Sequence, residues 1–412
     1  MAKRIMVLAS TFPARDNDDV PAFVRDQIIA IKQLRTDIDF DVLAPHDQKS
    51  NTVSYSEHPH YTEYRFHYFW PHRFEKLAGH SIMPALKENP LNYVLVPFLF
   101  FGELAATIKH VIKTRPDEIY AHWFTFQGLV ACIAGMMTRT PFVYTTHAAD
   151  VEVWKKIPLI GGSVVRFANR RARRITAVSP RSMAKLEQFF AAQDWQRFKS
   201  RTSIIPMGVH MNNSESELNP SELKRRYKLG DKTVLFFMGR LAHKKGVPYL
   251  LEAFSHLNQP NLHLVIAGDG QLRSSLETQA RKLNLENKVT FTGFLSGDEK
   301  QDYLNLADLM VLPSIITDDG DAEGLPVVFM EALAAGKVCI ATNESGADNI
   351  IQDGVSGFLL PHKDSDLLRS KIETALALDE TSKQNMQLAA RQTARQFDWQ
   401  AVARHHLDFF NW

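Results

Sequence analysis

Two glutamates, Glu323 and Glu331, lie eight residues apart across a predicted helix start. Residues 327–335 lack Gly and Pro and follow one of each, which places the helix N-terminus near Leu325 or Pro326. Glu331 then lies about two turns along the helix, roughly 10–12 Å further down its axis. The paired carboxyl groups of a glycoside hydrolase lie about 5–9.5 Å apart. The wider spacing suits two separate hydroxyl clusters of one elongated ligand.

The first turn of this helix also offers a place for an anion, because its N–H groups have no partner within the helix. A sugar nucleotide combines an anionic diphosphate with two sets of hydroxyls, and so fits the pattern. An ordinary amphipathic helix is the alternative: Glu323 would then only favour the helix N-terminus, and Glu331 would be solvated.

Three predicted strands precede loops that bring basic residues toward Glu323. The strands span residues 233–238, 263–267 and 309–312, and the loops span 239–246, 268–270 and 313–323. Because parallel strands end at one edge of their sheet, we expect Arg240 and Lys245 to face Glu323. Arg can engage two diphosphate oxygens, and Lys supplies a mobile charge. Gly268 and Gly270 could simply permit a tight turn or a close backbone approach.

The first half of the chain has the alternating pattern of a Rossmann-like domain. Strands are predicted at residues 5–9, 39–44, 118–121, 142–146, 174–178 and 203–206, with a helix at 23–34 and further helical stretches between them. His147 follows one of these strands directly, where ligands of such sheets bind. A loop histidine is also commonly just solvated. Residues 211–220, rich in Asn, Ser and Glu, indicate a linker between two domains.

Composition excludes several classes of protein. The 412 residues and 45% hydrophobic content allow two domains, and a net charge of +2 does not indicate a nucleic-acid binder. Cys132 and Cys339 lie in apolar surroundings, so neither a disulfide framework nor a thiolate metal site is expected. A reducing cytoplasm is the expected compartment. The N-terminus leads into a strand rather than a signal peptide, and no segment is expected to reach the roughly 18 apolar residues of a transmembrane helix.

Two segments between the second strand and residue 118 break the alternating pattern. Residues 64–76 interleave aromatic and basic side chains, and residues 93–101 are almost wholly apolar. Such side chains suit the headgroup zone of an anionic membrane. A buried helix and an aromatic strand would give the same pattern. Five arginines between Arg166 and Arg174 either mark a solvated helix end or extend the same basic face.

Taken together, the motifs resemble the retaining family 4 glycosyltransferases, and the similarity covers essentially the whole chain. In the second half the motifs are Gly239-Arg240-Leu241 with Lys245-Gly246, Ala267-Gly268-Asp269-Gly270, Thr292-Gly293-Phe294, Pro313-Ser314, and Glu323-Gly324-Leu325-Pro326 to Glu331-Ala332. In the first half they are Thr11-Phe12-Pro13, Ala121-His122-Trp123, Thr146-His147 to Asp150, Ala177-Val178-Ser179 and Ile205-Pro206-Met207-Gly208. The first-half motifs are similar to those of surface-polysaccharide and lipid-linked-sugar members.

The resemblance implies the α/β GT-B fold, with two Rossmann-like domains facing across a cleft. Residues 1–208 with about 392–412 would form the acceptor-side domain, and residues 209–391 the nucleotide-sugar domain. A C-terminal helix at 397–410 would cross back to the first domain.

It also implies roles for individual residues. Arg240 and Lys245 would hold the donor diphosphate, Glu323 the donor sugar and Glu331 the ribose, with His147 reaching the transferred sugar. The other donor-binding positions would be Gly239, Gly268, Gly270, Gly293, Phe294, Gly324 and Leu325, and the acceptor-side positions Phe12, Pro13 and Asp150.

The family chemistry needs neither a metal nor a cofactor, since cationic side chains and helix dipoles neutralise the departing diphosphate. Retaining members react on one face of the sugar, with no side chain as general base. Two loops depart from the family pattern: residues 343–349 have one glycine where two are common, and residues 14–19 replace a glycine pair. Asp318, Asp319 and Asp321 suggest the metal-binding Asp-x-Asp of the other glycosyltransferase fold, although Arg240 and Lys245 already supply cations.

The expected function is therefore transfer of a hexose from a nucleotide diphosphate sugar to a lipid-linked or growing surface glycan. The protein would be cytoplasmic and peripheral, at the anionic inner face of the membrane. A sugar-nucleotide epimerase, a phosphorylase of the same fold and a non-catalytic nucleotide-sugar-binding scaffold are the alternatives.

Overall fold

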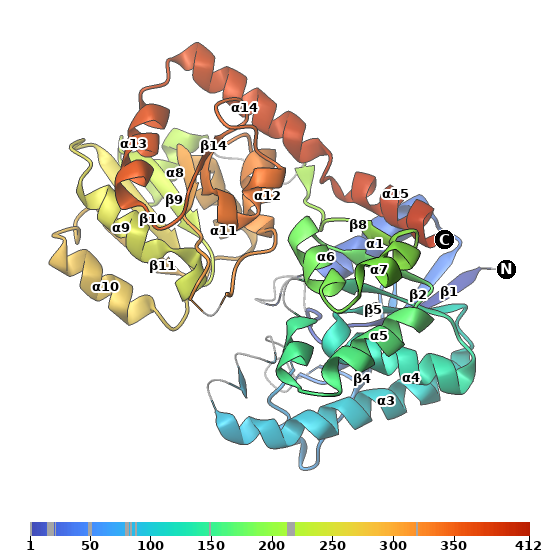
Figure 1. The fold of residues 1–412 in the computed structure, drawn as a ribbon. Helices are drawn as coiled ribbons and strands as arrows, with labels where there is room; N and C mark the ends of the chain where they lie inside the picture. The colour runs from blue at the N-terminus through green and yellow to red at the C-terminus, as the bar shows by residue number, and fades with distance from the viewer. Residues whose placement is uncertain are drawn as a thin grey trace. The chain divides into compact units, whose positions relative to one another are not determined.

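The computed structural model describes residues 2–14, 20, 22–47, 52–78, 82, 85–86, 89–147, 150–211, 219–318 and 320–412 (Figure 1). It divides into two compact units, Met1–Gly208 with Trp399–Trp412, and Val209–Asp398. The expected linker at residues 211–220 lies mostly outside the described residues.

The chain returns to the first unit at Trp399 rather than at about residue 392. Helix α14 (Glu380–Arg395) explains the difference, because it packs on α12 (Val327–Ala334) and buries Met386 in the core of the second unit.

The first unit is built on an eight-stranded sheet with the order β3-β4-β2-β1-β5-β6-β7-β8, in which only β3 is antiparallel to its neighbour. The strands are β1 (Lys3–Leu8), β2 (Ile38–Pro45), β3 (Tyr55–Glu57), β4 (Thr62–Phe66), β5 (Glu118–His122), β6 (Phe142–Thr146), β7 (Arg174–Ala177) and β8 (Thr202–Ile204). The helices are α1 (Phe23–Leu34), α3 (Leu95–Thr114), α4 (Leu129–Thr138), α5 (Gly161–Arg171), α6 (Pro180–Glu187), α7 (Ala192–Lys199) and α15 (Trp399–Phe410). Shorter helical turns are η1 (His72–Phe74), η2 (Pro90–Val94), η3 (Phe124–Gly128) and η4 (Glu152–Lys156).

Both faces of this sheet are covered, which is why its central strands are nearly continuous apolar runs. Met6 and Leu8 of β1 face a core shared with α3 to α7, while Ile5 and Val7 are fully buried on the other face. On that second face, the residues at the end of the chain, just after α15, hold this helix in place. The Trp412 indole donates to Glu118 Oε2 at 2.6 Å, and Arg173 binds the same carboxylate.

The second unit has a fully parallel six-stranded sheet with the order β11-β10-β9-β12-β13-β14. Its strands are β9 (Thr233–Met238), β10 (Leu262–Ala267), β11 (Val289–Gly293), β12 (Leu309–Leu312), β13 (Val338–Thr342) and β14 (Phe358–Leu360). Besides α12 and α14, its helices are α8 (Pro220–Arg226), α9 (Val247–Ser255), α10 (Arg273–Lys282), α11 (Gly297–Leu306) and α13 (Ser365–Leu376), with short turns η6 (His243–Lys245), η7 (Asn343–Ser345) and η8 (Ala347–Asn349). This strand order reverses between β9 and β12, and ligands bind at such switch points.

One sequence expectation about α3 is wrong. With η2 it forms a continuous helical segment, Pro90–Thr114, that is long and apolar enough to cross a membrane. Glu103, Lys109 and His110 interrupt its apolar run, so the sequence alone does not indicate such a segment. Only 22% of its most apolar stretch is buried, which sets it apart from a core helix of comparable composition.

Candidate functional site

The second unit brings together the loops after β9 and β12, the two strands at its switch point. Lys245 Nζ lies 3.2 Å from Glu323 Oε2, and Lys244 Nζ lies 3.6 Å from Glu323 Oε1 and 3.2 Å from Asp321 Oδ1. The expected approach of Lys245 to Glu323 is therefore present. Lys244 also joins this cluster, although the sequence analysis gave it no role.

The Glu323 carboxylate is held ionised by its surroundings. Burial by itself would raise the pKa of Glu323, but the ammonium groups of Lys245 and Lys244 outweigh it and hold the pKa below its ordinary value. Lys245 is itself buried, at 8% exposure, while Arg240 is exposed. Lys245 is thus held beside Glu323, whereas among the described residues Arg240 forms no ion pair with Glu323.

Glycine is required where the two loops meet. Gly246 has φ +65°, and a Cβ there would lie 1.8 Å from the Pro313 carbonyl oxygen. The Ile315 N–H donates to the Lys244 carbonyl oxygen at 2.8 Å. The loops after β9 and β12 are therefore joined through their backbones.

Two of the expected donor-binding glycines, Gly268 and Gly270, also lie at close backbone approaches. A Cβ at Gly268 would lie 2.0 Å from the Gly239 carbonyl oxygen, and the Gly268 N–H donates to the Gly293 carbonyl oxygen at 2.7 Å. A Cβ at Gly270 would meet Leu241 O at 2.5 Å. These contacts bring the ends of β9, β10 and β11 together, so tight packing alone accounts for Gly268 and Gly270.

Phe294 follows β11 and is 57% exposed. An exposed aromatic ring at this edge of the sheet offers a stacking face for a planar group.

The helix expected to start near Leu325 or Pro326 is α12, which follows Pro326 directly. Gly346, with φ +83°, packs against the loop just before it, since its Cβ would lie 2.1 Å from the Gly324 carbonyl oxygen. The single glycine of residues 343–349 thus supports Gly324 and Leu325. Glu331 is bound by Lys300 of α11, with Nζ 2.6 Å from Oε1. Lys300 is a second cation that the sequence analysis did not identify.

The aspartates before Glu323 pair with lysines. Asp318 lies 3.3 Å from Lys363, and Asp321 lies 3.2 Å from Lys244. Asp319 lies outside the described residues. Since Asp318 and Asp321 already have cationic partners on two different segments, they do not form a ready metal site.

In the first unit, His147 lies on the loop after β6, the strand next to β5. Its Nε2 is 3.2 Å from His122 Nδ1, and its ring packs 4.8 Å from that of Trp123 and 5.3 Å from that of Phe23. Burial, with a smaller contribution from His406, lowers the pKa of His147 to about 3. The imidazole is therefore neutral at physiological pH and can exchange hydrogen bonds with a hydroxyl group.

The Asp150 carboxyl forms hydrogen bonds with neighbouring loop and strand residues. Its Oδ2 accepts the Phe124 N–H at 2.6 Å, and its Oδ1 accepts the Thr146 hydroxyl at 2.5 Å. Burial raises the pKa of Asp150 to about 6, although these donors oppose the shift. Asp150, which was expected on the acceptor side, thus joins the loops after β5 and β6 through its carboxyl group.

Phe12 and Pro13 are also interior positions. Phe12 is 1% exposed and packs on Tyr61, and the carbonyl oxygens of Phe12 and Pro13 both accept from Arg65. Their side chains anchor the start of the loop after β1 and present no surface to an acceptor. The remainder of that loop, residues 15–19 and 21, lies outside the described residues, as do residues 148 and 149 next to His147.

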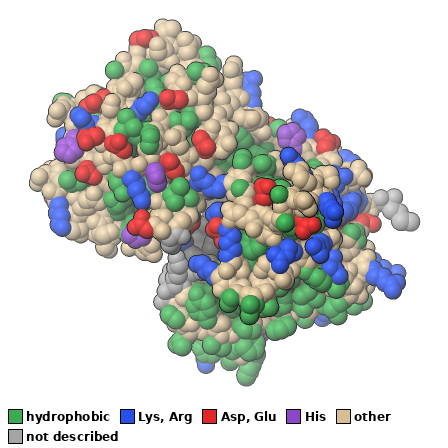
Figure 2. Space-filling view, viewed as in Figure 1, with side chains coloured by type: hydrophobic (Ala, Val, Ile, Leu, Met, Phe, Trp, Pro, Cys, Tyr) green, Lys and Arg blue, Asp and Glu red, His purple; other side chains and the backbone are tan. Residues whose placement is uncertain are grey.

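An apolar surface covers one edge of the first unit (Figure 2). We call this the α3 surface; its exposed large side chains are Trp70, Phe74, Leu91, Tyr93, Val94, Phe98, Phe101 and Ile112. Exposed basic residues on the same segments are Arg73, Lys76, Lys109 and Lys113. The buried side of α3 is mixed, since Glu103, Thr107 and His110 are buried along with Leu95, Leu99 and Val111, while Phe98 and Phe101 face solvent.

Comparison with known proteins relates the chain to glycosyltransferases. Residues 220–393 match the family model described as glycosyl transferases group 1, and residues 32–198 match a glycosyl transferase 4-like domain. The two matches lie in different halves of the chain and together cover most of it, so both halves are similar to glycosyltransferase domains. Each matched range falls within one unit, and the matches agree with the family 4 resemblance of the motifs.

Curated glycosyltransferases are similar to parts of the chain. Amylovoran biosynthesis glycosyltransferase AmsK of Erwinia amylovora is 36% identical over 46% of this chain and 48% of its own length. The GDP-mannose-dependent alpha-(1-6)-phosphatidylinositol monomannoside mannosyltransferase of Mycobacterium tuberculosis is 28% identical over 71% of this chain and 76% of its own. The alpha-D-kanosaminyltransferase of Streptomyces kanamyceticus is 33% identical over 36% of this chain and 37% of its own. The chain thus spans less than half the length of two of these glycosyltransferases.

Solved structures confirm the GT-B fold of this glycosyltransferase. Anabaena Alr3699/HepE, in complex with UDP and glucose, has a TM-score of 0.72 at 21% identity and 99% coverage of both chains. Sucrose-phosphate synthase from Thermosynechococcus elongatus has a TM-score of 0.75 at 19% identity, covering 99% of this chain and 98% of that one.

Proposed function

We propose that this glycosyltransferase moves a hexose from a nucleotide diphosphate sugar to a lipid-linked or growing surface glycan with retention of configuration. The observation that carries the proposal is the Lys245–Glu323 pair at the β9–β12 switch point. The group 1 match and the polysaccharide and glycolipid enzymes among the relatives of the chain support it. Structurally similar HepE was solved with UDP and glucose.

The residues of the second unit have the chemistry that the donor requires. Lys245 and Arg240 offer two cations to the diphosphate. The ionised Glu323 can accept hydrogen bonds from sugar hydroxyls, and Glu331, of which Lys300 contacts only Oε1, can do the same for the ribose. The exposed ring of Phe294 is available to the base.

The reaction then needs no carboxylate nucleophile and no metal ion. The bond between the anomeric carbon and the diphosphate oxygen breaks, the acceptor oxygen bonds to the same face, and the acceptor proton passes to the departing phosphate oxygen. Lys245 and Arg240 stabilise the charge that develops there. Neutral His147 offers a hydrogen bond to the transferred sugar without adding a charge.

The acceptor side of the proposal rests on the α3 surface. Apolar side chains beside Lys and Arg suit the headgroup and acyl boundary of an anionic membrane. Helix α3 exposes Phe98 and Phe101 on this surface although it buries the polar side chains of Glu103 and Thr107. We therefore propose that the protein binds the cytoplasmic face of the membrane peripherally, where a lipid-linked acceptor is held.

Glu323→Ala tests the proposed chemistry, with Asp318→Ala as the control on the same loop. Transfer should fall by roughly 10²–10³-fold in the first variant and stay near wild type in the second. Donor consumption without an acceptor would favour an epimerase, and nucleotide binding without any turnover would favour a scaffold. Full transfer by Glu323→Ala would refute the assigned site.

A further inference from the structure

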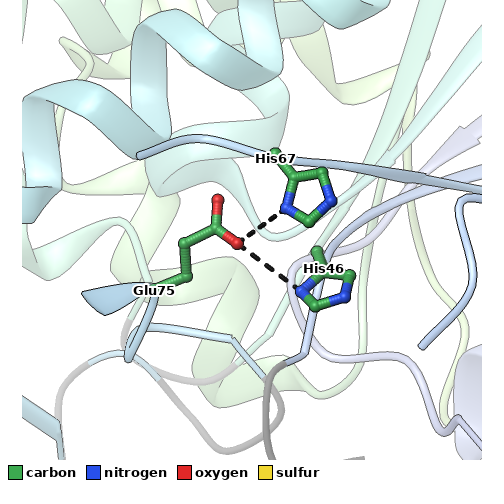
Figure 3. Close-up of side chains that lie close together, drawn as sticks. All are labelled: His46, His67 and Glu75. Atoms are coloured by element: carbon green, nitrogen blue, oxygen red, sulfur yellow. Dashed lines mark hydrogen bonds and ion pairs between the residues drawn. The ribbon is translucent and has the colours of Figure 1, made fainter. Parts of the chain in front are cut away.

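Three side chains meet at the carboxyl ends of β2 and β4, in a place that the glycosyltransferase chemistry does not use. The two strands pair in parallel with Pro45 opposite Phe66, so His46 and His67 are the next residues along each strand. Their rings lie 4.2 Å apart, and Glu75, just after η1, points its carboxylate between them (Figure 3). Glu75 Oε2 is 2.8 Å from His67 Nδ1 and 3.5 Å from His46 Nδ1.

We propose that His46, His67 and Glu75 bind a divalent transition metal, with zinc as the best match to two imidazole nitrogens and one carboxylate oxygen. One potential ligand atom from each residue lies within 4.8 Å of the others. Zinc bonds of about 2.0–2.1 Å in tetrahedral geometry require ligand atoms roughly 3.3 Å apart. The two distances to Glu75 bracket this value, so small side-chain shifts would complete the site.

The charge balance of Glu75 supports a cation there. Its side chain is fully buried, and its ion-pair partners among the described residues are the three histidines His46, His67 and His72. Burying a carboxylate without a compensating charge is costly. No lysine or arginine in the described part of the chain lies within ion-pair distance, so a bound dication would supply the missing charge.

The ligand atoms are also available and oriented. His46 Nδ1 is buried and faces Glu75 Oε2 at 3.5 Å. Glu75 Oε1 accepts the Tyr68 and Phe69 N–H groups at 2.6 and 3.0 Å, which fixes the carboxylate as supporting groups do in known metal sites.

The position of the site gives it a structural purpose. It would tie residues 67–75 to the ends of β2 and β4, and this segment contributes Trp70 and Phe74 to the α3 surface. His67 remains 34% exposed, on a pocket of about 420 Å³ lined by His67, Tyr68, Phe69, Trp70, His72 and Phe98. A fourth ligand, such as water, could reach the site from this pocket. This inference does not depend on the proposed function.

Zinc titration of the chelator-treated protein tests the site by calorimetry. The wild type should bind one equivalent of Zn²⁺, and His67→Ala and Glu75→Gln should bind it more than about 100-fold more weakly, since loss of a supporting group alone costs 10–100-fold. His58→Ala is the matched control. His58 is 36% exposed and pairs with Glu63 at 3.2 Å, outside the cluster, so its removal should leave zinc binding unchanged.

Absorption spectroscopy with Co²⁺ tests the site even if one of these variants folds poorly. Co²⁺ bound to the wild type should give the visible absorption of a four-coordinate nitrogen and oxygen site, and His67→Cys should add a thiolate charge-transfer band. Absence of zinc binding to the wild type would overturn the proposal. Equal binding by wild type, His67→Ala and Glu75→Gln would overturn it as well.

Discussion

Lys245 and Glu323 come from loops 78 positions apart in the sequence, yet their charged atoms lie 3.2 Å from each other and both side chains are largely buried. Each compensates the charge of the other until a ligand arrives. A bound diphosphate would form an ion pair with Lys245. Glu323 could then accept hydrogen bonds from the hydroxyls of the donor sugar. Binding should therefore depend on Lys245 more than on Lys244, the outer of the two lysines.

The first prediction concerns nucleotide binding. In the wild type, one of UDP, GDP and ADP should raise the melting temperature without Mg²⁺, because a ligand that binds only the folded state stabilises it by about 2.7 kcal/mol at a hundredfold excess over Kd. Lys245→Ala should weaken this binding by roughly 10–100-fold, as expected for a lost charged hydrogen bond. Differential scanning fluorimetry across nucleotide concentrations measures both effects. Lys244→Ala is the control, and an equal loss in both variants would contradict the assignment.

The second prediction concerns pH. Burial raises the pKa of Glu103 to about 8, from an ordinary value of 4.5, despite the hydrogen bond from Gln127. Between these values the folded state binds more protons than the unfolded state, so the free energy of unfolding contributed by Glu103 falls as pH rises through this window. Glu103→Gln removes this contribution.

Urea unfolding of wild type and Glu103→Gln at pH 5 and pH 8 measures the effect. From pH 5 to pH 8, the free energy of unfolding of the variant should rise relative to that of the wild type by roughly 2–4 kcal/mol. A constant difference between the two proteins would show that Glu103 does not titrate in this range.

The third prediction concerns the membrane. Phe101 is 65% exposed on α3, and Phe101→Glu should greatly reduce co-sedimentation with anionic liposomes because it puts a carboxylate into the apolar contact. Leu388→Glu is the control, since Leu388 is 55% exposed on α14 of the second unit. Loss of binding in both variants, or in neither, would argue against the α3 surface as the contact.

The fourth prediction concerns Gly246. Gly246→Ala would force a Cβ into the Pro313 carbonyl, and we expect it to destabilise the protein by roughly 3–5 kcal/mol. Gly230→Ala is the matched control: Gly230 has φ +58° with nothing within 4 Å of the added Cβ. It should cost only the backbone strain of about 1–2 kcal/mol. Thermal unfolding compares the two, and equal losses would mean that the contact with Pro313 relaxes easily.

Much of the fold could be predicted because its sheets are parallel and buried. Continuous apolar runs located β6, β9 and β12 to the residue, and the helix start at Pro326 was readable from its Gly and Pro. The GT-B fold expected from the motif order is confirmed by the structural matches. β3 was not predicted and β4 overlaps only the alternative of an aromatic strand within residues 64–76, since a short edge hairpin rich in Tyr and Glu lacks the apolar signal of the other strands.

Side-chain partnerships were harder to predict. The strand order predicts that Lys245 lies near Glu323. The sequence does not predict the ion pair of Lys300 with Glu331. Nor does it predict that the Asp150 carboxyl accepts hydrogen bonds from Phe124 and Thr146. The cluster of His46, His67 and Glu75 was equally hidden. It depends on the register between β2 and β4, which residue spacing does not reveal.

The backbone bond from Ile315 to Lys244 and the contact of Gly246 with Pro313 join the two loops at the donor-side switch point before any ligand is present. The donor therefore meets a half-site that is already assembled, and little conformational entropy of these loops is lost when it binds. In kinetic terms, the loops after β9 and β12 should add no slow ordering step to donor association. Association would then depend on diffusion and on the charge of Arg240, and would slow as added salt screens that charge.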